Sequence, residues 1–573
     1  MTSPTAADDL ILGLTKVVDL PGLSAAAGTP LGAEDIEALL REAERFCAER
    51  IAPGWQDADR QGTTYANGTV TVPQHYHALM RDWIESGWQG VSASEAHGGQ
   101  GLPHAIWTAV VELASAADMA FFLGPILTAG AIDLLQGHAT QDQQARWLPK
   151  LVSGAWPGTM NLTEPQAGSD LAAIRSRAEP LGEGRYALHG QKIYITWGEH
   201  ETTENILHLV LARLPGAPEG SRGISLFAAP KILPDGRRNA LRCGGIERKL
   251  GIHASPTCIM LFEGAEAELV GEPGRGLNAM FAMMNAARLA VGVQGVGQGA
   301  RALQLAEAYA AQRTQSGRVI ADHPDVARML TEMRAVTLAG RLLALEAAAA
   351  LDRHHLLGDE AASVRLALLI PIVKSWCSDR GVDVASLGIQ VHGGMGFVED
   401  SGAAQVLRDA RIAPIYEGTN GIQAIDLLVR KVLPDGGASL GLMLDDLALD
   451  LQPARTTHAR VLAQLAAIRQ TTRTLVNAAA ADSTVAFRVA DDYLRAVALA
   501  LLGWAWSRIN AALEPESPAT PATREGATRW HAPAQALRHW VQPEFDMRLA
   551  IVHDLCAAPH DVTPKAQGRR DVL

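Results

Sequence analysis

Three long stretches of helical periodicity follow one another in the second half of this 573-residue chain, and they constrain its fold more than any other feature. They cover residues 277–314, 324–353 and 361–392, and in each of them apolar residues recur at helical spacing. The chain is rich in Ala, Leu and Gly and only 5% aromatic, a composition typical of tightly packed helices filled by small side chains. We therefore predict a mostly helical protein with a long helical block in its second half.

A change of periodicity divides the chain into predicted domains. Short alternating or apolar runs at 185–197, 206–214 and 223–229 indicate β-strands, with a tight turn at 182–184. Pro434 and the glycines after it end the helical block. The predicted domains are helical over 1–155, β over 156–275, helical over 276–440 and helical again over 441–573. The shorter predicted helices cover 34–50, 74–86, 105–117, 128–151, 445–482, 486–514 and 531–558.

The charge and the cysteines exclude several classes of protein. A formal net charge of -12 without a long basic run argues against a nucleic-acid partner. The five cysteines are scattered, odd in number and without Cys-x-x-Cys spacing, so we expect reduced thiols and neither a disulfide framework nor a metal site. The first twenty residues lack a basic n-region, and no uncharged run of membrane-spanning length appears. We expect a cytoplasmic protein without a membrane span.

Two segments of the predicted β domain carry residues that suit a ligand. Residues 160–170, MNLTEPQAGSD, predict a turn whose amides and hydroxyls face an acceptor-rich ligand, although the segment by itself favours an ordinary hydroxyl-rich loop. In the predicted strand 192–197, alternation places Tyr194 and Thr196 on one face. Such a pair could shield a planar ring and donate a hydrogen bond to it, although packing alone also favours these residue types in strands.

Residues 415–423, IYEGTNGIQ, contain a carboxylate of interest. They precede a helical run, and Asn420 and Gln423 are spaced as an N-cap residue and its reciprocal third residue. Glu417 is therefore predicted just before the start of a helix. A carboxylate at this place is either a favourable partner of the helix dipole or a base held in an apolar cleft.

Seven motifs occur together in the order and approximate spacing of acyl-CoA dehydrogenases, which the chain resembles over roughly residues 35–435. These motifs are TEPQAGSD (163–170), QKIYIT (191–196), KLGIHASPT (249–257), GEPGRGL (271–277), QVHGGMGF (390–397), LRDAR (407–411) and IYEGTNGIQ (415–423). The added C-terminal region and residues 284–292 resemble a longer branch of that family. The resemblance implies an N-terminal helical domain, a middle β-barrel-like domain and a C-terminal four-helix bundle, followed here by an extra helical domain.

The resemblance also implies an activity. A member of this family is a flavoprotein oxidoreductase of fatty acid metabolism and β-oxidation, which uses FAD to convert an acyl-CoA thioester to the trans-2-enoyl-CoA. Its electrons pass to electron-transfer flavoprotein, and it forms a homo-oligomer, for which we expect a homodimer. A related enzyme, an acyl-CoA oxidase that passes the electrons to oxygen, is the alternative that the same resemblance allows. The sequence does not show which acyl group the substrate carries.

Each implied role falls on a numbered residue. Glu417 matches the catalytic base. In other branches of the family the base lies on an earlier helix, immediately before the residue that corresponds to Arg288. This chain has Ala287 at that position, so Glu417 is the carboxylate that matches the family's base. The residues implied to bind FAD are Leu162, Thr163, Ser169, Tyr194, Thr196, Arg313, Gln390, Gly394 and Thr419. Those implied to bind the acyl-CoA are Ser169, Asn285, Arg288 and Gly418. Tyr194 replaces a common Trp and Asn285 a common Asp, so the detailed contacts depart from the family.

Two further motifs suggest other chemistry, and both stand in the wrong context. Residues 295–300 match the dinucleotide fingerprint of nicotinamide enzymes, but helical runs rather than β-α alternation surround them. Residues 437–441, GASLG, match the serine nucleophile elbow of an acyl-thioester hydrolase, but they fall in a predicted linker. A catalytically silent acyl-CoA-binding scaffold is a third alternative, against which the presence of Glu417 counts.

Overall fold

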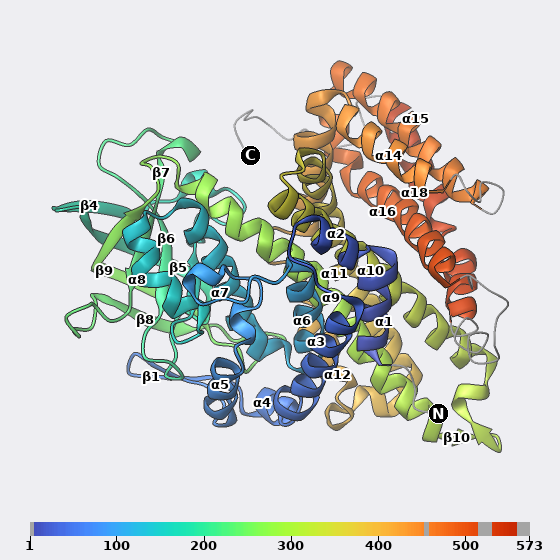
Figure 1. The fold of residues 1–573 in the computed structure, drawn as a ribbon, viewed down its shortest axis with the longest axis horizontal. Coiled ribbons are helices and arrows are strands. Elements are labelled where there is room, and N and C mark those ends of the chain that lie inside the picture. Colours follow the sequence, from blue (N-terminus) through green and yellow to red (C-terminus); the bar gives the residue numbers. More distant parts are fainter. Residues whose placement is uncertain (1–4, 452–457, 514–529, 558–573) are drawn as a thin grey trace. The chain divides into compact units, whose positions relative to one another are not determined.

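The computed structural model describes residues 5–451, 458–513 and 530–557, which divide into two compact units (Figure 1). The second unit contains residues 45–107 and 117–287, and the first contains the other described residues. The boundaries between the units fall within three helices, which are α3 (Ala33–Phe46), α6 (His104–Ala117) and α9 (Gly276–Gln312). Helices dominate and the strands concentrate in one β domain, so the predicted fold class is confirmed.

The β domain of the second unit is a seven-stranded sheet that closes on itself. Its strands follow the order β3-β6-β4-β5-β9-β7, β6 also pairs with β7, and β8 pairs with β9. The closed ladder is the barrel-like domain that the sequence resemblance predicts. The strands are β3 (Gly158–Asn161), β4 (Arg177–Gly182), β5 (Arg185–Thr196), β6 (Leu207–Arg213), β7 (Ile224–Pro230), β8 (Leu241–Ile246) and β9 (Thr257–Val270).

Strand β6 buries apolar residues on both of its faces, which explains a largely apolar sequence interrupted by the buried His208. Val210 and Ala212 belong to a buried cluster of sheet residues that includes Phe227. Leu209 and Leu211 point to the opposite face, in a second cluster that the helices α7 and α8 complete. The remaining elements of this unit are α4 (Trp55–Gln61), α5 (His75–Ser86), α7 (Met119–His138), α8 (Gln141–Val152) and the hairpin β1 (Thr64–Ala66) and β2 (Thr69–Thr71).

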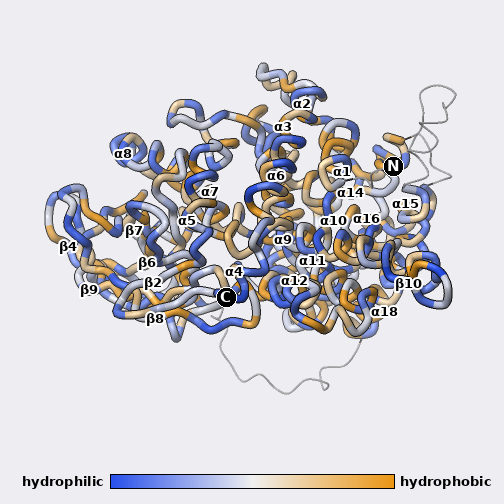
Figure 2. The backbone as a smooth tube through the Cα atoms, turned by 90° about the horizontal axis from the view of Figure 1, so that it is seen from below, coloured by the Kyte–Doolittle hydropathy of each residue, from blue (hydrophilic) through white to orange (hydrophobic). Residues whose placement is uncertain are grey.

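The first unit is built from long helices. Helices α10 and α11 pack along each other, and α16 contacts both of them as well as α13. Along these helices the tube in Figure 2 changes between hydrophobic and hydrophilic stretches, as expected of helices with one buried face. Besides α9, the helices are α1 (Ala6–Leu12), α2 (Leu20–Ala26), α10 (Pro324–Leu357), α11 (Glu360–His392), α12 (Ala403–Ala410), α13 (Asn420–Ile425), α14 (Ala438–Asp450), α15 (Ala459–Ala481), α16 (Thr484–Leu513) and α18 (Glu544–Ala557).

Glycines bring α9 close to its neighbours. A Cβ atom at Gly295 would lie 2.4 Å from the carbonyl oxygen of Cys377 on α11, and one at Gly297 would lie 2.8 Å from that of Glu112 on α6. The glycine-rich segment 295–300 is thus a packing surface inside a helix. It lies in the middle of α9 and not at a strand-to-helix turn, so the context of a nicotinamide fingerprint is missing.

The GASLG segment also lacks the context of a nucleophile elbow. Helical turns precede it, and Gly437 leads directly into α14. The carboxylate of Asp435 accepts hydrogen bonds from the backbone N–H groups of Gly437, Ala438 and Ser439. The segment therefore forms the capped start of a helix rather than a strand-to-helix turn.

Several predicted helices are interrupted. The stretch 128–151 spans parts of two helices, because Thr140 and Gln143 form a capping box that starts α8 after α7 has ended at His138. The stretch 445–482 spans parts of α14, which ends at Asp450, and of α15, which begins at Ala459, and it includes residues 452–457, which the structure does not describe. Of the predicted helix 531–558, the described part ends at Ala557 as α18. In the stretch 128–151 periodicity continues across a helix cap, and in 531–558 it continues across the turn at 542–543 that precedes α18.

Four helical segments among the described residues have the length and composition to cross a membrane. They cover His104–His138, Gly276–Gln312, Glu360–Phe397 and Thr484–Leu513, and between 67% and 89% of each apolar window is buried within the protein. Internal packing accounts for that apolarity, while the expected lack of a membrane span stays a prediction.

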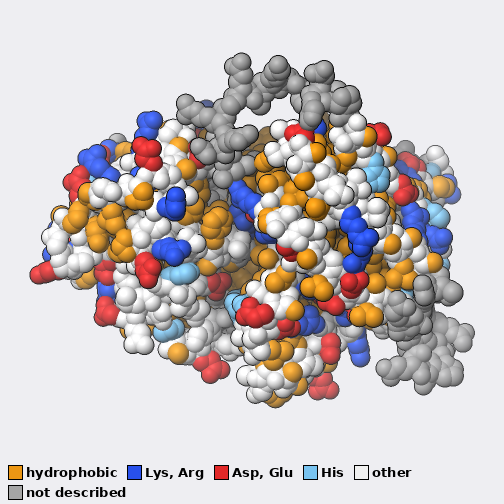
Figure 3. All heavy atoms as spheres, turned by 90° about the horizontal axis from the view of Figure 1, so that it is seen from above, with side chains coloured by type: hydrophobic (Ala, Val, Ile, Leu, Met, Phe, Trp, Pro, Cys, Tyr) orange, Lys and Arg blue, Asp and Glu red, His pale blue; other side chains and the backbone are white. Residues whose placement is uncertain are grey.

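On the face shown in Figure 3, Lys and Arg side chains are interspersed with Asp and Glu. No disulfide bond joins the five cysteines, all of which lie in the part of the chain that the structure describes.

Candidate active site

Glu417 lies in a strained loop between α12 and α13. Its φ angle is 56° and that of Gly418 is 84°, so two successive residues occupy the left-handed region. For a residue with a side chain this conformation costs about 1–3 kcal/mol and persists where the surroundings hold it. Glu417 itself is partly buried. The strain marks the loop as a candidate site.

Buried donors hold both carbonyl groups of this loop. The carbonyl oxygen of Glu417 accepts hydrogen bonds from Nε2 of Gln423 at 3.1 Å and from Nε of Arg288 at 3.4 Å. The carbonyl oxygen of Gly418 accepts one from Nζ of Lys374 at 2.7 Å. These contacts join α9, α11 and α13 at the loop and fix its conformation.

The helix after the loop is capped by Thr419, so the prediction of Asn420 as N-cap residue is wrong. The Thr419 side chain accepts a hydrogen bond from the backbone N–H of Ile422. Asn420 lies in the first turn, and its buried amide accepts from Lys374 at 2.8 Å and donates to Asp379 at 2.7 Å. Cap spacing alone could not show that this side chain points inward to satisfy a buried lysine.

The surroundings of Glu417 tune its acidity toward neutral pH. Burial raises the pKa of Glu417 to about 7, against the opposing effects of Arg288 and Lys374. Burial lowers the pKa of Lys374 to about 7 and also lowers the pKa of Arg288. A carboxyl group with such a pKa can both accept and release a proton near pH 7.

Lys374 and Gln294 complete the site and were not predicted. Lys374 is fully buried, and a lone lysine in the apolar run 368–377 of α11 was the signal that could have revealed it. Gln294 is also fully buried, and its Oε1 accepts a hydrogen bond from the hydroxyl of Tyr416, the residue before Glu417. The loop is therefore held by groups from α9 on one side and from α11 on the other.

A second group of candidate residues lies in the second unit, where a buried lysine joins two segments. The backbone N–H of Ile193 donates to the carbonyl oxygen of Thr163 at 2.9 Å. Nζ of Lys192 donates to the carbonyl oxygen of Leu162 at 3.0 Å and to Glu164 at 2.8 Å. The segment around Thr163 therefore lies beside the end of β5.

The end of β5 is irregular, which corrects the predicted alternation. The register of β5 against β9 shifts between Lys192 and Ile195, and Tyr194 has a φ angle of 60°. Because of this bulge, regular alternation cannot place Tyr194 and Thr196 on one face. The side chain of Tyr194 is 60% exposed, and Thr196 is partly exposed. An exposed aromatic ring between hydroxyl-bearing segments fits a planar ligand with polar edges.

The other predicted residues lie on loops and helix ends. Ser169 is exposed in the loop after β3, and Asn285 is partly buried on α9. Arg313, Gln390, Gly394 and Thr419 are all exposed. Tyr309 stacks on His392 with ring centroids 4.6 Å apart, so the end of α9, which Arg313 follows, lies beside the end of α11 that carries Gln390. Among the described residues, no cluster of three His, Cys, Asp or Glu side chains could hold a metal ion.

Comparison with known families gives matches along most of the chain. Residues 33–155 match the N-terminal domain, residues 159–265 the middle domain and residues 274–432 the C-terminal domain of acyl-CoA dehydrogenases. The chain is 50% identical over 421 residues to 3-methylmercaptopropionyl-CoA dehydrogenase of Ruegeria pomeroyi, a match covering 70% of this chain and 72% of that protein.

Two solved structures extend the comparison. A chain in the structure titled "Electron transferring flavoprotein of Acidaminococcus fermentans" is 27% identical, with a TM-score of 0.59, and the match covers 68% of this chain and 96% of that one. The structure of Caenorhabditis elegans ACDH-11 in complex with C11-CoA has a TM-score of 0.73 at 23% identity and covers 93% of this chain and 94% of that one. The second likeness shows that the shared fold extends into the C-terminal helices.

Proposed function

Since this chain belongs to the acyl-CoA dehydrogenase family of oxidoreductases, we propose that it removes hydrogen from the α and β carbons of an acyl-CoA, with Glu417 as the base. The observation that carries this proposal is the place of Glu417 in a strained, partly buried loop that raises its pKa to about 7. The product is the trans-2-enoyl-CoA.

The residues around Glu417 explain how a carboxylate can take a weakly acidic α proton. Burial makes the ionised form a stronger base than an exposed glutamate, while Arg288 and Lys374 keep that form accessible near neutral pH. The hydrogen bonds to the carbonyl groups of Glu417 and Gly418 fix the backbone from which the carboxylate extends. A base held in place avoids the cost of ordering it during the reaction.

FAD is the proposed cofactor, and the exposed end of β5 fits it. The exposed ring of Tyr194 would lie against the flavin, and Leu162, Thr163 and Thr196 would meet its polar edge. Arg313, Gln390, Gly394 and Thr419 are proposed to hold the adenosine and pyrophosphate part, and Ser169 to lie near both the flavin and the acyl-CoA. Bound FAD supplies the acceptor for the β hydride.

The proposed electron acceptor is electron-transfer flavoprotein. A solved structure titled for such a flavoprotein supports this, because a chain in it shares the fold at 27% identity. An oxidase would instead pass electrons to oxygen. Turnover in air with hydrogen peroxide formation and no need for an added flavoprotein would assign the protein to the oxidases.

The proposed substrate is an acyl-CoA. Its acyl group is to be identified by testing a panel of acyl-CoA thioesters for reduction of the flavin. The panel starts from 3-methylmercaptopropionyl-CoA, for which the relative with 50% identity is named, and continues with saturated and branched acyl-CoAs. Asn285, Arg288 and Gly418 are the proposed contacts of the substrate in addition to Ser169.

The test is anaerobic reduction of the flavin. The purified protein should be yellow, and one acyl-CoA of the panel should bleach its flavin band in the absence of oxygen. A protein that cannot take up FAD, or that no acyl-CoA of the panel bleaches, would contradict the proposal and favour a silent scaffold. That the protein forms a homodimer stays a prediction, which light scattering in solution can test. That it is located in the cytoplasm also stays a prediction, which cell fractionation can test.

A further inference from the structure

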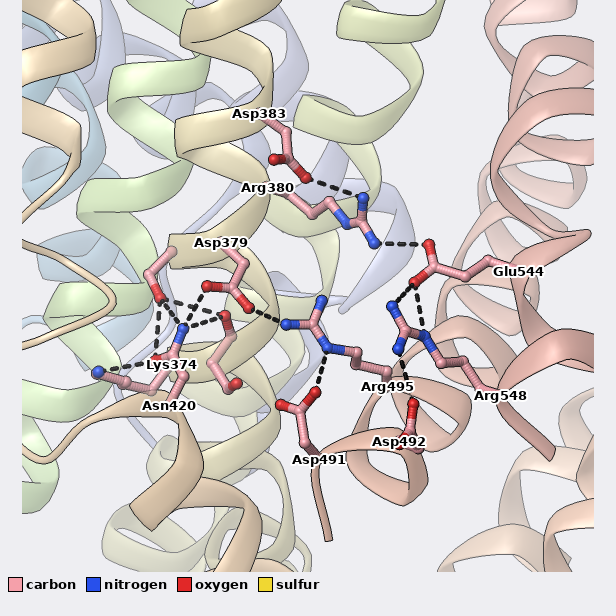
Figure 4. A network of polar contacts seen from close by, with 12 residues as sticks. Lys374, Asp379, Arg380, Asp383, Asn420, Asp491, Asp492, Arg495, Glu544 and Arg548 are labelled. Atoms are coloured by element: carbon pink, nitrogen blue, oxygen red, sulfur yellow. Dashed lines mark hydrogen bonds and ion pairs between the residues drawn. The ribbon is translucent and has the colours of Figure 1, made fainter. Parts of the chain in front are cut away.

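A continuous chain of polar contacts runs from the C-terminal helix α16 to the loop of Glu417 (Figure 4). Nη2 of Arg495 on α16 donates to Asp379 at 2.6 Å, and the other carboxylate oxygen of Asp379 accepts from Nδ2 of Asn420 at 2.7 Å. Oδ1 of Asn420 accepts from Nζ of Lys374 at 2.8 Å, and the same Nζ donates to the carbonyl oxygen of Gly418 at 2.7 Å. Four contacts thus connect α16 to the carbonyl group of Gly418, the residue after Glu417.

The members of this chain are shielded from water. Lys374 is fully buried and Asn420 is 8% exposed. The side chains of Arg495 and Asp379 are 20% and 21% exposed. Charge-assisted hydrogen bonds in such surroundings are stronger than their counterparts at the surface. Arg495 is also fixed on its own helix by Asp491 at 2.8 Å.

We propose that Arg495 is a positioning residue through which the extra C-terminal helices hold the loop of the catalytic base. The proposal rests on the proposed role of Glu417. It gives a function to a part of the chain that lies beyond the matched family domains, which end at residue 432.

The balance of charges explains why Arg495 matters at a distance. Arg495 is the cation that neutralises Asp379 from the side of α16, which leaves Asp379 free to orient the amide of Asn420. Without Arg495, the negative charge of Asp379 would act more strongly on Lys374, whose pKa it already raises. A shift of Lys374 would release the carbonyl oxygen of Gly418, and the left-handed pair at 417–418 would then relax.

A second connection between α11 and the C-terminal helices supplies a matched control. Arg548 on α18 pairs with Asp492 at 2.7 Å and with Glu544 at 2.8 Å, and Glu544 in turn pairs with Arg380 on α11 at 2.6 Å (Figure 4). Like Arg495, Arg548 has two carboxylate partners and a side chain about one-fifth exposed, at 21%. In Figure 4 its contacts do not lead to Asn420.

The experiment compares Arg495→Met with Arg548→Met in the full-length protein loaded with FAD. Hydrogen exchange followed by mass spectrometry over residues 415–423 needs no catalysis. We expect exchange in this segment to accelerate about tenfold in Arg495→Met and to stay near the wild-type rate in Arg548→Met. The rate of flavin bleaching at saturating acyl-CoA should fall about tenfold in Arg495→Met alone, because a displaced base slows the chemical step. Arg495→Lys should recover part of both effects.

The outcomes separate this proposal from the proposed function. Equal exchange over 415–423 in the two methionine variants would overturn the positioning role, whatever the enzyme does. Faster exchange in Arg495→Met with an unchanged bleaching rate would also overturn it, because the loop would then be held without effect on the base. A wild-type protein that no acyl-CoA bleaches would refute the proposed function while leaving the exchange comparison readable.

Discussion

The protein uses a buried lysine at each of its two candidate sites, and the two lysines differ in their partners. Lys192 in the second unit and Lys374 in the first are both fully buried. Lys192 pairs directly with the carboxylate of Glu164 at 2.8 Å. Each lysine also donates to a backbone carbonyl group, but the side-chain partner of Lys374 is the neutral amide of Asn420.

The different partners give the two lysines different roles. The ion pair of Lys192 and Glu164, called the clamp below, stabilises the structure, whereas Lys374 tunes the acidity of a nearby carboxyl group. Although burial alone would raise it, Lys192 and hydrogen bonds lower the pKa of Glu164 to about 2, so this carboxylate stays ionised. Among the described residues, no cation forms an ion pair with the carboxylate of Glu417, and burial raises its pKa to about 7. A directly paired glutamate is too weak a base for catalysis, whereas one that cations influence from a distance can exchange a proton.

The largest effect is expected when the base is removed. Glu417→Gln keeps the shape of the side chain and should lower the rate of anaerobic flavin bleaching by about 10³-fold. The FAD content should remain that of the wild type, because the proposed cofactor contacts are untouched. Bleaching at the wild-type rate would show that another group is the base.

Breaking the clamp should affect stability rather than acidity. Lys192→Met leaves Glu164 buried without its cation, which should cost about 3–5 kcal/mol of unfolding free energy and weaken FAD retention. Thermal unfolding and the ratio of flavin to protein measure both effects. Lys150→Met, at an exposed lysine of α8, is the control and should change neither. Equal losses in the two variants would remove the distinction between a clamp and a surface charge.

The pH dependence follows from the raised pKa of Glu417. The base must be ionised to act, and its ionised fraction grows as the pH rises through about 7. The bleaching rate should therefore rise about tenfold per pH unit well below this midpoint and level off above it. A profile that is flat between acidic and neutral pH would contradict a base with a raised pKa.

Removing the distant cation should shift that profile. Lys374→Met takes away a positive charge that favours ionised Glu417, so the midpoint should move upward by about one pH unit. The measurement is the same bleaching rate across the pH range. An unchanged midpoint would mean that Lys374 acts through the backbone of Gly418 alone.

The sequence predicted most of the architecture because its periodicity is strong. The long helices α9, α10 and α11 and the strands β5, β6 and β7 lie close to the expected ranges. The breaks between helices were missed, because a capping box such as that of Thr140 is a short signal within a longer apolar pattern.

The candidate site was only partly predictable. Glu417 was found through its motif, but the roles of Lys374 and Asn420 depend on contacts between residues 46 positions apart, which no local pattern reveals. The bulge at Tyr194 was missed because strand alternation assumes a regular ladder. Sequence patterns therefore identified the reacting group, whereas the groups that hold it required the structure.

The most direct test of Glu417 as the base is proton exchange at the α carbon without hydride transfer. 3,3-Dimethylbutyryl-CoA has α protons and no β hydrogen, so it can be deprotonated but not dehydrogenated. In D₂O the protein loaded with FAD should introduce deuterium at the α carbon, as measured by mass spectrometry, and Glu417→Gln should lose this activity. Exchange at the same rate in both proteins would contradict the assignment of Glu417.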